Sequence, residues 1–300
     1  MKATAIALIL VAAGCGKPRQ GAGGGGGGGA NERVMIQNKG SDTMVNLAQA
    51  WAEGYRAVKP NVGVAISGGG SGTGIAALIN GTVDIANASR DLEPREADLA
   101  KKNTGKDPVR HVVALDAIAV IVHPSNPLAE IALAQVACIY GADGTCAKWS
   151  DLNVEVPACS GQEIVRASRQ NNSGTYHYFR EVVLGKKDFR LGSRDMNGSK
   201  EVTDLVAHTP CAIGYTGLGY LTPGVKALCI AAEPGKPCSQ PTKQSAISGE
   251  YAIARDLYMY TLGPPQGTVR GYLDWILSEA GQAAVEQAGY IPVPRERRGK

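Results

Sequence analysis

The chain has 300 residues, with 31 lysine and arginine residues against 27 aspartate and glutamate residues and a formal net charge of +4 at pH 7. Residues 295–300 contain four basic residues and one acidic residue, so the rest of the chain is close to neutral. Nothing in it resembles the basic face with interleaved aromatic residues that binds nucleic acid, and no nucleic-acid partner is expected. We expect the basic tail to be a solvated end.

Residues 1–14 predict a secretory leader, because one lysine is followed by an apolar run and then by small residues. The apolar run is too short to span a bilayer. Small residues directly before Cys15 resemble the lipobox of bacterial lipoproteins, although Ala12 stands where leucine is usual. This resemblance implies that Cys15 carries a lipid that anchors the protein to a membrane. Residues 15–31 are rich in glycine and predict a flexible tether after the anchor.

Apart from Cys15, the chain has an even number of cysteines, which is typical of an oxidising compartment. They are Cys138, Cys146, Cys159, Cys211, Cys229 and Cys238. The short spacings from Cys138 to Cys146 and from Cys229 to Cys238 suggest two local disulfide bonds, which leaves Cys159 with Cys211. Other pairings of the same cysteines stay open. No metal site is expected, because no Cys-x-x-Cys pair is present and the four histidines are scattered.

The roughly 270 residues after the tether exceed what one core comfortably holds, which predicts two lobes. Residues 34–37 and 62–66 predict strands. Between them, residues 44–58 predict a helix with one buried face, because apolar residues recur every three or four positions. Residues 83–86 predict a further strand. Strands that alternate with helices indicate a parallel sheet, in which the ligand crevice lies at the carboxyl ends of the strands.

A glycine-rich turn, residues 67–81, joins the second of these strands to a short helix that Gly81 ends. The first turn of that helix begins at Ser71. It leaves backbone N–H groups unpaired at the positive end of the helix dipole, which is a place for an anion. Glycine-rich turns of this kind are also common in α/β proteins without any such ligand.

The same turn recurs later in the chain. Residues 164–168 predict a strand, and Ser173, Gly174 and Thr175 then open a helix that Gly185 ends. Two helix starts, one in each predicted lobe, could therefore face one ligand.

Further segments complete the two lobes. Residues 109–122 and 251–260 predict long strands that cross between the lobes. The first lobe is then expected to comprise residues 32–119 and 252–300, and the second residues 120–251. Further predicted elements are the helices at residues 94–102, 131–140, 203–207, 269–278 and 281–289, the strand at residues 212–215 and the loop at residues 229–238.

The patterns of the common hydrolytic sites do not fit. A nucleophile elbow requires glycine two residues on either side of the serine, but Thr73 follows Ser71 at that distance, and Asn171 precedes Ser173. A phosphate-binding loop for nucleotides requires a lysine after its glycines, and none follows here. The sequence therefore predicts a protein that is not an enzyme.

A small oxyanion held by neutral donors and one arginine does fit. Hydroxyl groups at Ser71, Thr73, Ser173 and Thr175 and the backbone N–H groups of both turns are directional donors without charge. Arg169, four residues before Ser173, can add a charged, bidentate contact.

The chain resembles the phosphate-binding proteins of bacterial high-affinity phosphate ABC transporters. Five segments carry the resemblance in the order of the family: residues 39–43, 68–74, 83–90, 149–152 and 169–175. It implies an α/β fold of the class II periplasmic-binding-protein type, in which two lobes are joined by two crossing strands with the ligand cleft between them. It also implies a monomer without cofactors, in the periplasm or at the cell surface, that delivers inorganic phosphate to ABC transporter permease subunits.

The resemblance and the motifs together give a predicted ligand set for the phosphate. Its members are Ser41, Asp42, Thr43, Ser71, Gly72, Thr73, Arg90, Arg169, Ser173, Gly174 and Thr175.

Two positions depart from the family pattern. Asp42 stands where a hydroxyl or small residue is common, and Arg90 stands where an aspartate commonly accepts the phosphate proton. Our hypothesis is that Asp42 is the proton acceptor of this chain and that Arg90 is a second cation that holds Asp42 or the phosphate. Two other classes stay open: a carrier for sulfate, molybdate or tungstate, and a secreted phosphatase or a sensor on the same fold.

Overall fold

The computed structural model of the protein describes residues 33–298. The predicted leader, the tether and the predicted lipidation site Cys15 lie outside these residues. Among the helices of residues 33–298, none combines the length and the apolar character that a membrane span requires.

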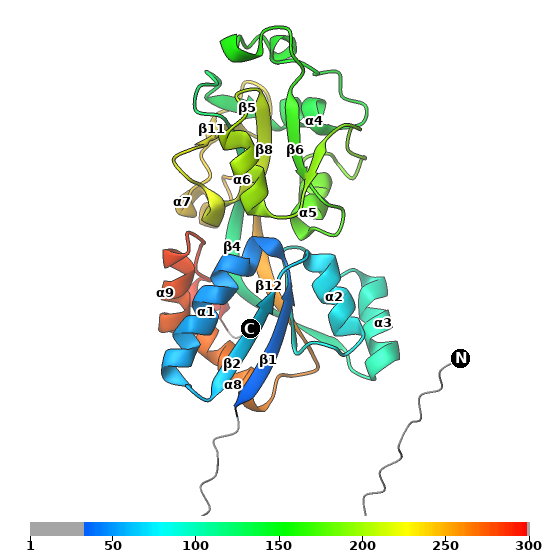
Figure 1. Ribbon diagram of the computed structural model, residues 1–300, viewed down its shortest axis with the longest axis vertical. Helices are drawn as coiled ribbons and strands as arrows, with labels where there is room; N and C mark the ends of the chain where they lie inside the picture. The colour runs from blue at the N-terminus through cyan, green and yellow to red at the C-terminus, as the bar shows by residue number, and fades with distance from the viewer. Residues whose placement is uncertain (1–32, 299–300) are drawn as a thin grey trace, which may run out of the picture. The chain divides into compact units, whose positions relative to one another are not determined.

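The first lobe is built on a parallel sheet. Strand β1 (Val34–Gly40) lies between β2 (Val62–Ser67) and β3 (Ile85–Ala88). Helices cover both faces of this sheet (Figure 1). One face packs against α1 (Val45–Val58), α8 (Gly267–Ile276) and α9 (Glu279–Gln287). The other packs against α2 (Ser71–Ile79), on which α3 (Pro94–Thr104) lies.

The apolar residues whose spacing predicted the first helix form part of the core of this lobe. Leu47, Trp51 and Tyr55 lie on one face of α1 and are buried against Tyr272 of α8. The indole of Trp51 also donates to the carbonyl of Gly281 in α9 at 2.9 Å, which ties the last helix of the chain to the first.

Two long antiparallel strands pass between the lobes, β4 (Pro108–Val122) and β12 (Ala254–Leu262) (Figure 1). β12 lies between β3 and β4, so the strand order is β2-β1-β3-β12-β4-β8-β6-β7. From Ile118 onward, β4 pairs with β8 (Ala212–Gly217) of the second lobe. A single sheet thus runs through both lobes.

The second lobe continues this sheet with β6 (Val165–Arg169) and β7 (Arg194–Met196). Its core contains stacked aromatic rings: Phe179 and Tyr215 lie 3.9 Å apart between ring centroids, and Tyr140 packs edge-on to both. The remaining elements are α4 (Leu133–Tyr140), α5 (Gly174–Val182), α6 (Ser199–Ala207), α7 (Lys243–Ser248), the short strands β5 (Glu130–Ala132), β9 (Lys226–Ala227), β10 (Cys229–Ala231) and β11 (Cys238–Ser239), and 3-10 turns at Asp42–Met44, Trp149–Leu152, Pro157–Cys159, Leu218–Tyr220 and Arg295–Arg297.

The predicted fold class is confirmed, the structure corrects two local predictions, and it contains elements that the sequence did not reveal. The predicted helix at residues 131–140 begins only at Leu133, because strand β5 precedes it. The predicted loop at residues 229–238 contains β10 and β11, which form a small sheet with β5. β7 and α7 were missed, since segments this short leave no readable periodicity.

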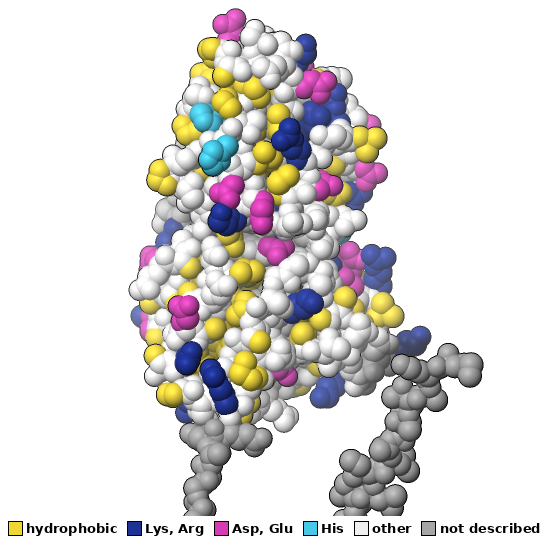
Figure 2. Space-filling view, viewed as in Figure 1, with side chains coloured by type: hydrophobic (Ala, Val, Ile, Leu, Met, Phe, Trp, Pro, Cys, Tyr) yellow, Lys and Arg dark blue, Asp and Glu magenta, His cyan; other side chains and the backbone are white. Residues whose placement is uncertain are grey.

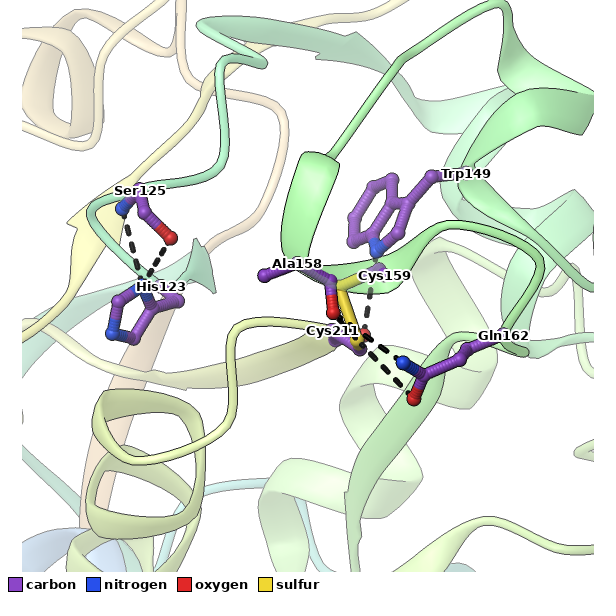
Figure 3. The surroundings of a disulfide bond; sticks show 7 residues. All are labelled: His123, Ser125, Trp149, Ala158, Cys159, Gln162 and Cys211. Carbon is purple, nitrogen blue, oxygen red and sulfur yellow. Dashed lines mark hydrogen bonds between the residues drawn. A yellow bond between two sulfur atoms is a disulfide. The ribbon is translucent and has the colours of Figure 1, made fainter.

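The three disulfide bonds suggested by the cysteine spacing are present. They join Cys138 to Cys146, Cys159 to Cys211, and Cys229 to Cys238. Figure 3 shows the second of these beside Trp149, whose indole donates to the carbonyl of Cys211 at 3.3 Å. Trp149 and both of these cysteines are buried.

The disulfide bonds close loops of different size, so we expect them to stabilise the protein unequally. The sequence separation is 52 residues for Cys159–Cys211 and 8 residues for Cys138–Cys146. Chain-entropy scaling makes the longer closure more stabilising by about 1.7 kcal/mol. Paired Cys→Ser replacements, compared by urea unfolding at one temperature, measure this difference. Equal losses of stability for the two pairs would contradict the loop-entropy account.

Candidate functional site

Two helix N-termini meet at the junction between the lobes. α2 begins at Ser71 after β2, and α5 begins at Gly174 after β6. Figure 1 shows the two helices on opposite sides of this junction. Gly174 lies directly against the first lobe, because a Cβ atom on it would stand 2.3 Å from Ser71 Oγ and 2.6 Å from Ser89 Oγ. The two equivalent turns predicted from the sequence are therefore in contact.

Buried hydroxyl groups surround this contact. Ser41 Oγ donates to Ser89 Oγ at 2.9 Å, and the backbone N–H of Ser89 donates to Ser71 Oγ at 3.0 Å. Across the junction, Thr43 Oγ1 and Thr175 Oγ1 are hydrogen-bonded at 2.7 Å. All five residues are at most 2% exposed. So many buried hydroxyl groups in one place are typical of a site for a polar ligand rather than of a core.

Ser173 is the N-cap of α5. Its Oγ accepts from the backbone N–H groups of Thr175 and Tyr176, so its own hydrogen can be donated elsewhere. The side chain is therefore positioned by the helix that it caps.

Arg169 is the buried cation of the site. It lies at the end of β6, and its Nη1 donates to Ser199 Oγ at 3.0 Å while Nη2 donates to the carbonyl of Asn197 at 3.1 Å. Its side chain is fully buried, and its Nε has no hydrogen-bond partner among the described residues. Burial lowers the pKa of Arg169, and the nearby carboxylate of Asp42 opposes this effect.

Asp42 reaches Arg169 from the other lobe. Its Oδ2 accepts from Arg169 Nη2 at 3.2 Å, and its Oδ1 accepts from the backbone N–H of Gly69 at 2.7 Å. The carboxylate is 18% exposed, so it stands at the edge of the buried cluster. Tyr220 fixes the backbone here, because its hydroxyl donates to the carbonyl of Asp42 at 2.7 Å.

The glycine-rich turn is held from the second lobe by Asn172. The backbone carbonyl of Asn172 accepts from the N–H of Gly72 at 2.9 Å, and its Nδ2 donates to the carbonyl of Gly69 at 2.9 Å. A Cβ atom on Gly70, which has a φ of +89°, would lie 2.6 Å from the Asn172 carbonyl oxygen. The glycines therefore allow this close backbone contact between the lobes.

Three members of the predicted ligand set are placed differently from the prediction. Arg90 was predicted to hold Asp42 or the phosphate. The structure does not pair it with Asp42: Arg90 makes a bidentate pair with Glu96, at 2.8 and 2.7 Å, six residues along the chain. The Gly72 N–H is used by Asn172, and the half-buried Thr73 makes no hydrogen bond to the buried hydroxyl groups among the described residues.

Two residues of the site were missed from the sequence. Ser89 lies within one of the family segments but was not singled out there. Arg255 lies on β12 and donates to Ser89 O, Asp116 Oδ2 and Thr175 Oγ1 at 2.8–3.0 Å. The signal for Arg255 was a charged residue at the start of a strand whose following residues, after Asp256, are mostly apolar and buried.

The charges of the site balance, because Asp42 faces Arg169 and Asp116 faces Arg255. On the face that Figure 2 shows, acidic and basic side chains are interspersed, without a large patch of one sign. The arrangement can hold a small anion by directional donors, and it presents no nucleophile paired with a base at the two helix starts. The fold and site define a two-lobed binding protein for a small polar ligand.

Comparison with known proteins agrees with this class. Residues 21–280 match the family described as the PBP superfamily domain. The phosphate-binding protein PstS of Pseudomonas aeruginosa is 34% identical over 86% of this chain and 83% of its own length. PstS of Bacillus subtilis is 30% identical over 85% of this chain and 79% of its own.

A solved structure of a phosphate ABC transporter substrate-binding protein from Clostridium perfringens, with bound phosphate, has a TM-score of 0.76 to this chain. It is 27% identical, and the match covers 87% of this chain and 100% of that one. A solved structure from Planctomyces limnophilus has a TM-score of 0.61 at 31% identity, and the match covers 88% of this chain and 94% of that one. The chain belongs to the PstS family of phosphate-binding proteins, within the PBP superfamily.

Proposed function

We propose that this protein binds inorganic phosphate between its two lobes, outside the cytoplasmic membrane, and delivers it to the permease of an ABC transporter. The observation that carries the proposal is the meeting of two helix N-termini and a buried arginine within one cluster of buried hydroxyl groups. Helix N-termini and hydroxyl groups bind phosphate oxygens, and the relatives and the phosphate-bound neighbour support phosphate as the ligand.

The proposed ligands come from both lobes. Arg169 and α5 contribute the charged contact and the helix start of the second lobe, and α2 contributes the helix start of the first. The proposed set is Ser41, Asp42, Thr43, Ser71, Ser89, Arg169, Ser173, Gly174 and Thr175, with lobes at residues 32–119 with 252–300 and at residues 120–251.

Isothermal titration calorimetry of the folded protein with phosphate and with sulfate tests this function. Native mass spectrometry of protein purified from rich medium gives a second readout, because a retained ligand adds a discrete mass. Binding of sulfate or molybdate without binding of phosphate would replace the proposal by the carrier for another oxyanion. Steady release of phosphate from a chromogenic ester would instead favour an enzyme.

We further propose that Asp42 selects phosphate by accepting its proton. Near neutral pH phosphate still carries a proton and sulfate does not, so a carboxylate would meet a lone pair on sulfate. Asp42 is suited to this role because a carboxylate has about four acceptor positions, and residues 33–298 use only two of them, through Gly69 and Arg169.

Asp42→Asn should lower phosphate affinity by about 2 kcal/mol, roughly thirtyfold, and narrow the preference for phosphate over sulfate. Calorimetry with both anions measures the two effects. The control is Asp188→Asn, because Asp188 is 82% exposed and pairs with Arg180 at the surface. Unchanged phosphate affinity together with unchanged rejection of sulfate would eliminate the proposed proton-acceptor role.

The proposal includes a lipid anchor on Cys15, followed by the tether of residues 15–31. It places the protein in the periplasm or at the cell surface as a monomer without catalytic activity. Intact-mass analysis of the original protein and of Cys15→Ala tests for the lipid, because only the original protein should carry the added mass.

A further inference from the structure

A buried ion pair joins the two strands that cross between the lobes. Asp116 of β4 and Arg255 of β12 are register partners in the antiparallel pairing of these strands. Arg255 Nη2 donates to Asp116 Oδ2 at 3.0 Å, and the two side chains are 2% and 0% exposed. Neither residue belongs to the proposed ligand set, although Arg255 donates to the proposed ligand Thr175.

The pair lies where β4 changes its partner. Ala117 is the last residue of β4 in register with β12, and Ile118 is the first in register with β8. Asp116 Oδ1 also accepts from the backbone N–H of Leu218, which directly follows β8, at 3.0 Å. A change in the angle between the lobes has to be absorbed at such strand-to-strand transitions, so the pair occupies the hinge.

Arg255 also contacts both lobes. Its Nη1 donates to the carbonyl of Ser89, at the end of β3 in the first lobe, at 2.8 Å. Its Nη2 donates to Thr175 Oγ1, in the first turn of α5 in the second lobe, at 2.9 Å. The same Thr175 hydroxyl is hydrogen-bonded to Thr43 Oγ1 of the first lobe.

The hydrogen bonds of Arg255 to Ser89 and Thr175 require one particular angle between the two lobes. A guanidinium group is planar and has its donors in fixed directions, so once Asp116 holds it, its other donors cannot follow two acceptors that move apart. The bonds to Ser89 and Thr175 can be made together only when the lobes are closed.

We propose that Asp116 and Arg255 form a hinge clamp, in which Arg255 is a positioning residue that stabilises the closed arrangement of the lobes and thereby slows release of the bound anion. The clamp rests on the proposed function only in naming phosphate as that anion. It acts on the angle between the lobes, so it should not alter the preference among anions, in contrast to Asp42.

Stopped-flow kinetics with phosphate test the clamp. In Arg255→Met the dissociation rate should rise about tenfold to a hundredfold, with an association rate within about threefold of the original protein. The ratio of phosphate to sulfate affinity should stay unchanged. The matched control is Arg297→Met, because Arg297 pairs at 2.7 Å with Asp256, the next residue on β12, away from the site. An unchanged dissociation rate in Arg255→Met would overturn the proposal.

Arg255→Lys keeps the buried charge and serves if Arg255→Met fails to fold. A lysine ammonium can pair with Asp116 but cannot reach Ser89 and Thr175 in the same directions, so we expect an intermediate dissociation rate. A dissociation rate equal to that of the original protein would refute the clamp, because the clamp depends on the fixed donor directions of the guanidinium group.

Small-angle X-ray scattering separates this proposal from the phosphate proposal. Without added anion, the clamp predicts a larger mean radius of gyration for Arg255→Met and Arg255→Lys than for the original protein and for Arg297→Met. Identical radii would overturn the clamp. Failure of the original protein to bind phosphate would refute the proposed function, and the scattering comparison would still stand.

Discussion

Replacement of Arg169 by methionine should reduce phosphate affinity by about 4 kcal/mol, roughly a thousandfold. Arg169 is the cation at the helix start of the second lobe, and its fully buried side chain is already held by Ser199 and by the backbone of Asn197. Because these contacts orient the guanidinium before the anion arrives, its charged hydrogen bonds carry little ordering cost. Methionine keeps much of the apolar stem and removes every donor.

Calorimetry and stopped-flow kinetics at constant ionic strength measure this loss. The variant also leaves Asp42 without its partner in the other lobe, so Arg169→Met with Asp42→Asn serves as a second variant. If the double variant recovers most of the affinity, the loss arises from the unpaired carboxylate and Arg169 is not a ligand. Arg166→Met is the control for a buried arginine on the same strand. Arg166 lies outside the hydroxyl cluster, and its contacts are long, at 3.4 Å to the carbonyl of Ile164 and 4.0 Å to the carboxylate of Glu163.

Much of the fold was predictable because its longer elements bury one face. The spacing of Leu47, Trp51 and Tyr55 predicted α1 and its buried side, and the long apolar run at residues 109–122 predicted the crossing strand β4. The two Ser-Gly-Thr turns were recognised as equivalent, and the structure brings their helices together. Local patterns of this kind do not depend on distant partners.

The contacts between lobes were not predictable in the same way. Arg90 lies in a family segment and Arg255 lies in none, but of the two only Arg255 reaches the buried hydroxyl groups, because Glu96 in the first turn of α3 holds Arg90. The sequence likewise predicted that the Gly72 N–H in the glycine-rich turn binds the anion. In the structure this N–H donates to the backbone carbonyl of Asn172 in the other lobe. Which donor is free depends on the tertiary structure.

The second large effect on phosphate affinity is expected from the methyl group that Gly174→Ala adds. Gly174→Ala places a Cβ atom 2.3 Å from Ser71 Oγ and 2.6 Å from Ser89 Oγ, both in the opposite lobe. Contacts this short cannot be accommodated while the lobes are closed, and overpacking of this kind costs about 3 kcal/mol, roughly a hundredfold in affinity. We therefore expect phosphate binding to weaken by at least this factor, although no charge and no donor is removed.

The folding of the second lobe should not suffer from the same change. Gly174 opens α5 and has no positive φ, so alanine fits its backbone and favours the helix. Thermal unfolding without added anion should thus occur at the same or a higher temperature, whereas the stabilisation by phosphate should be lost. The control is Gly271→Ala within α8, where the nearest atom to the added Cβ is the Tyr55 hydroxyl at 3.1 Å. If Gly174→Ala binds phosphate with the original affinity, the lobes do not close on the ligand through the contact of Gly174 with Ser71 and Ser89, and the arrangement of the two helix starts has to be assigned another role.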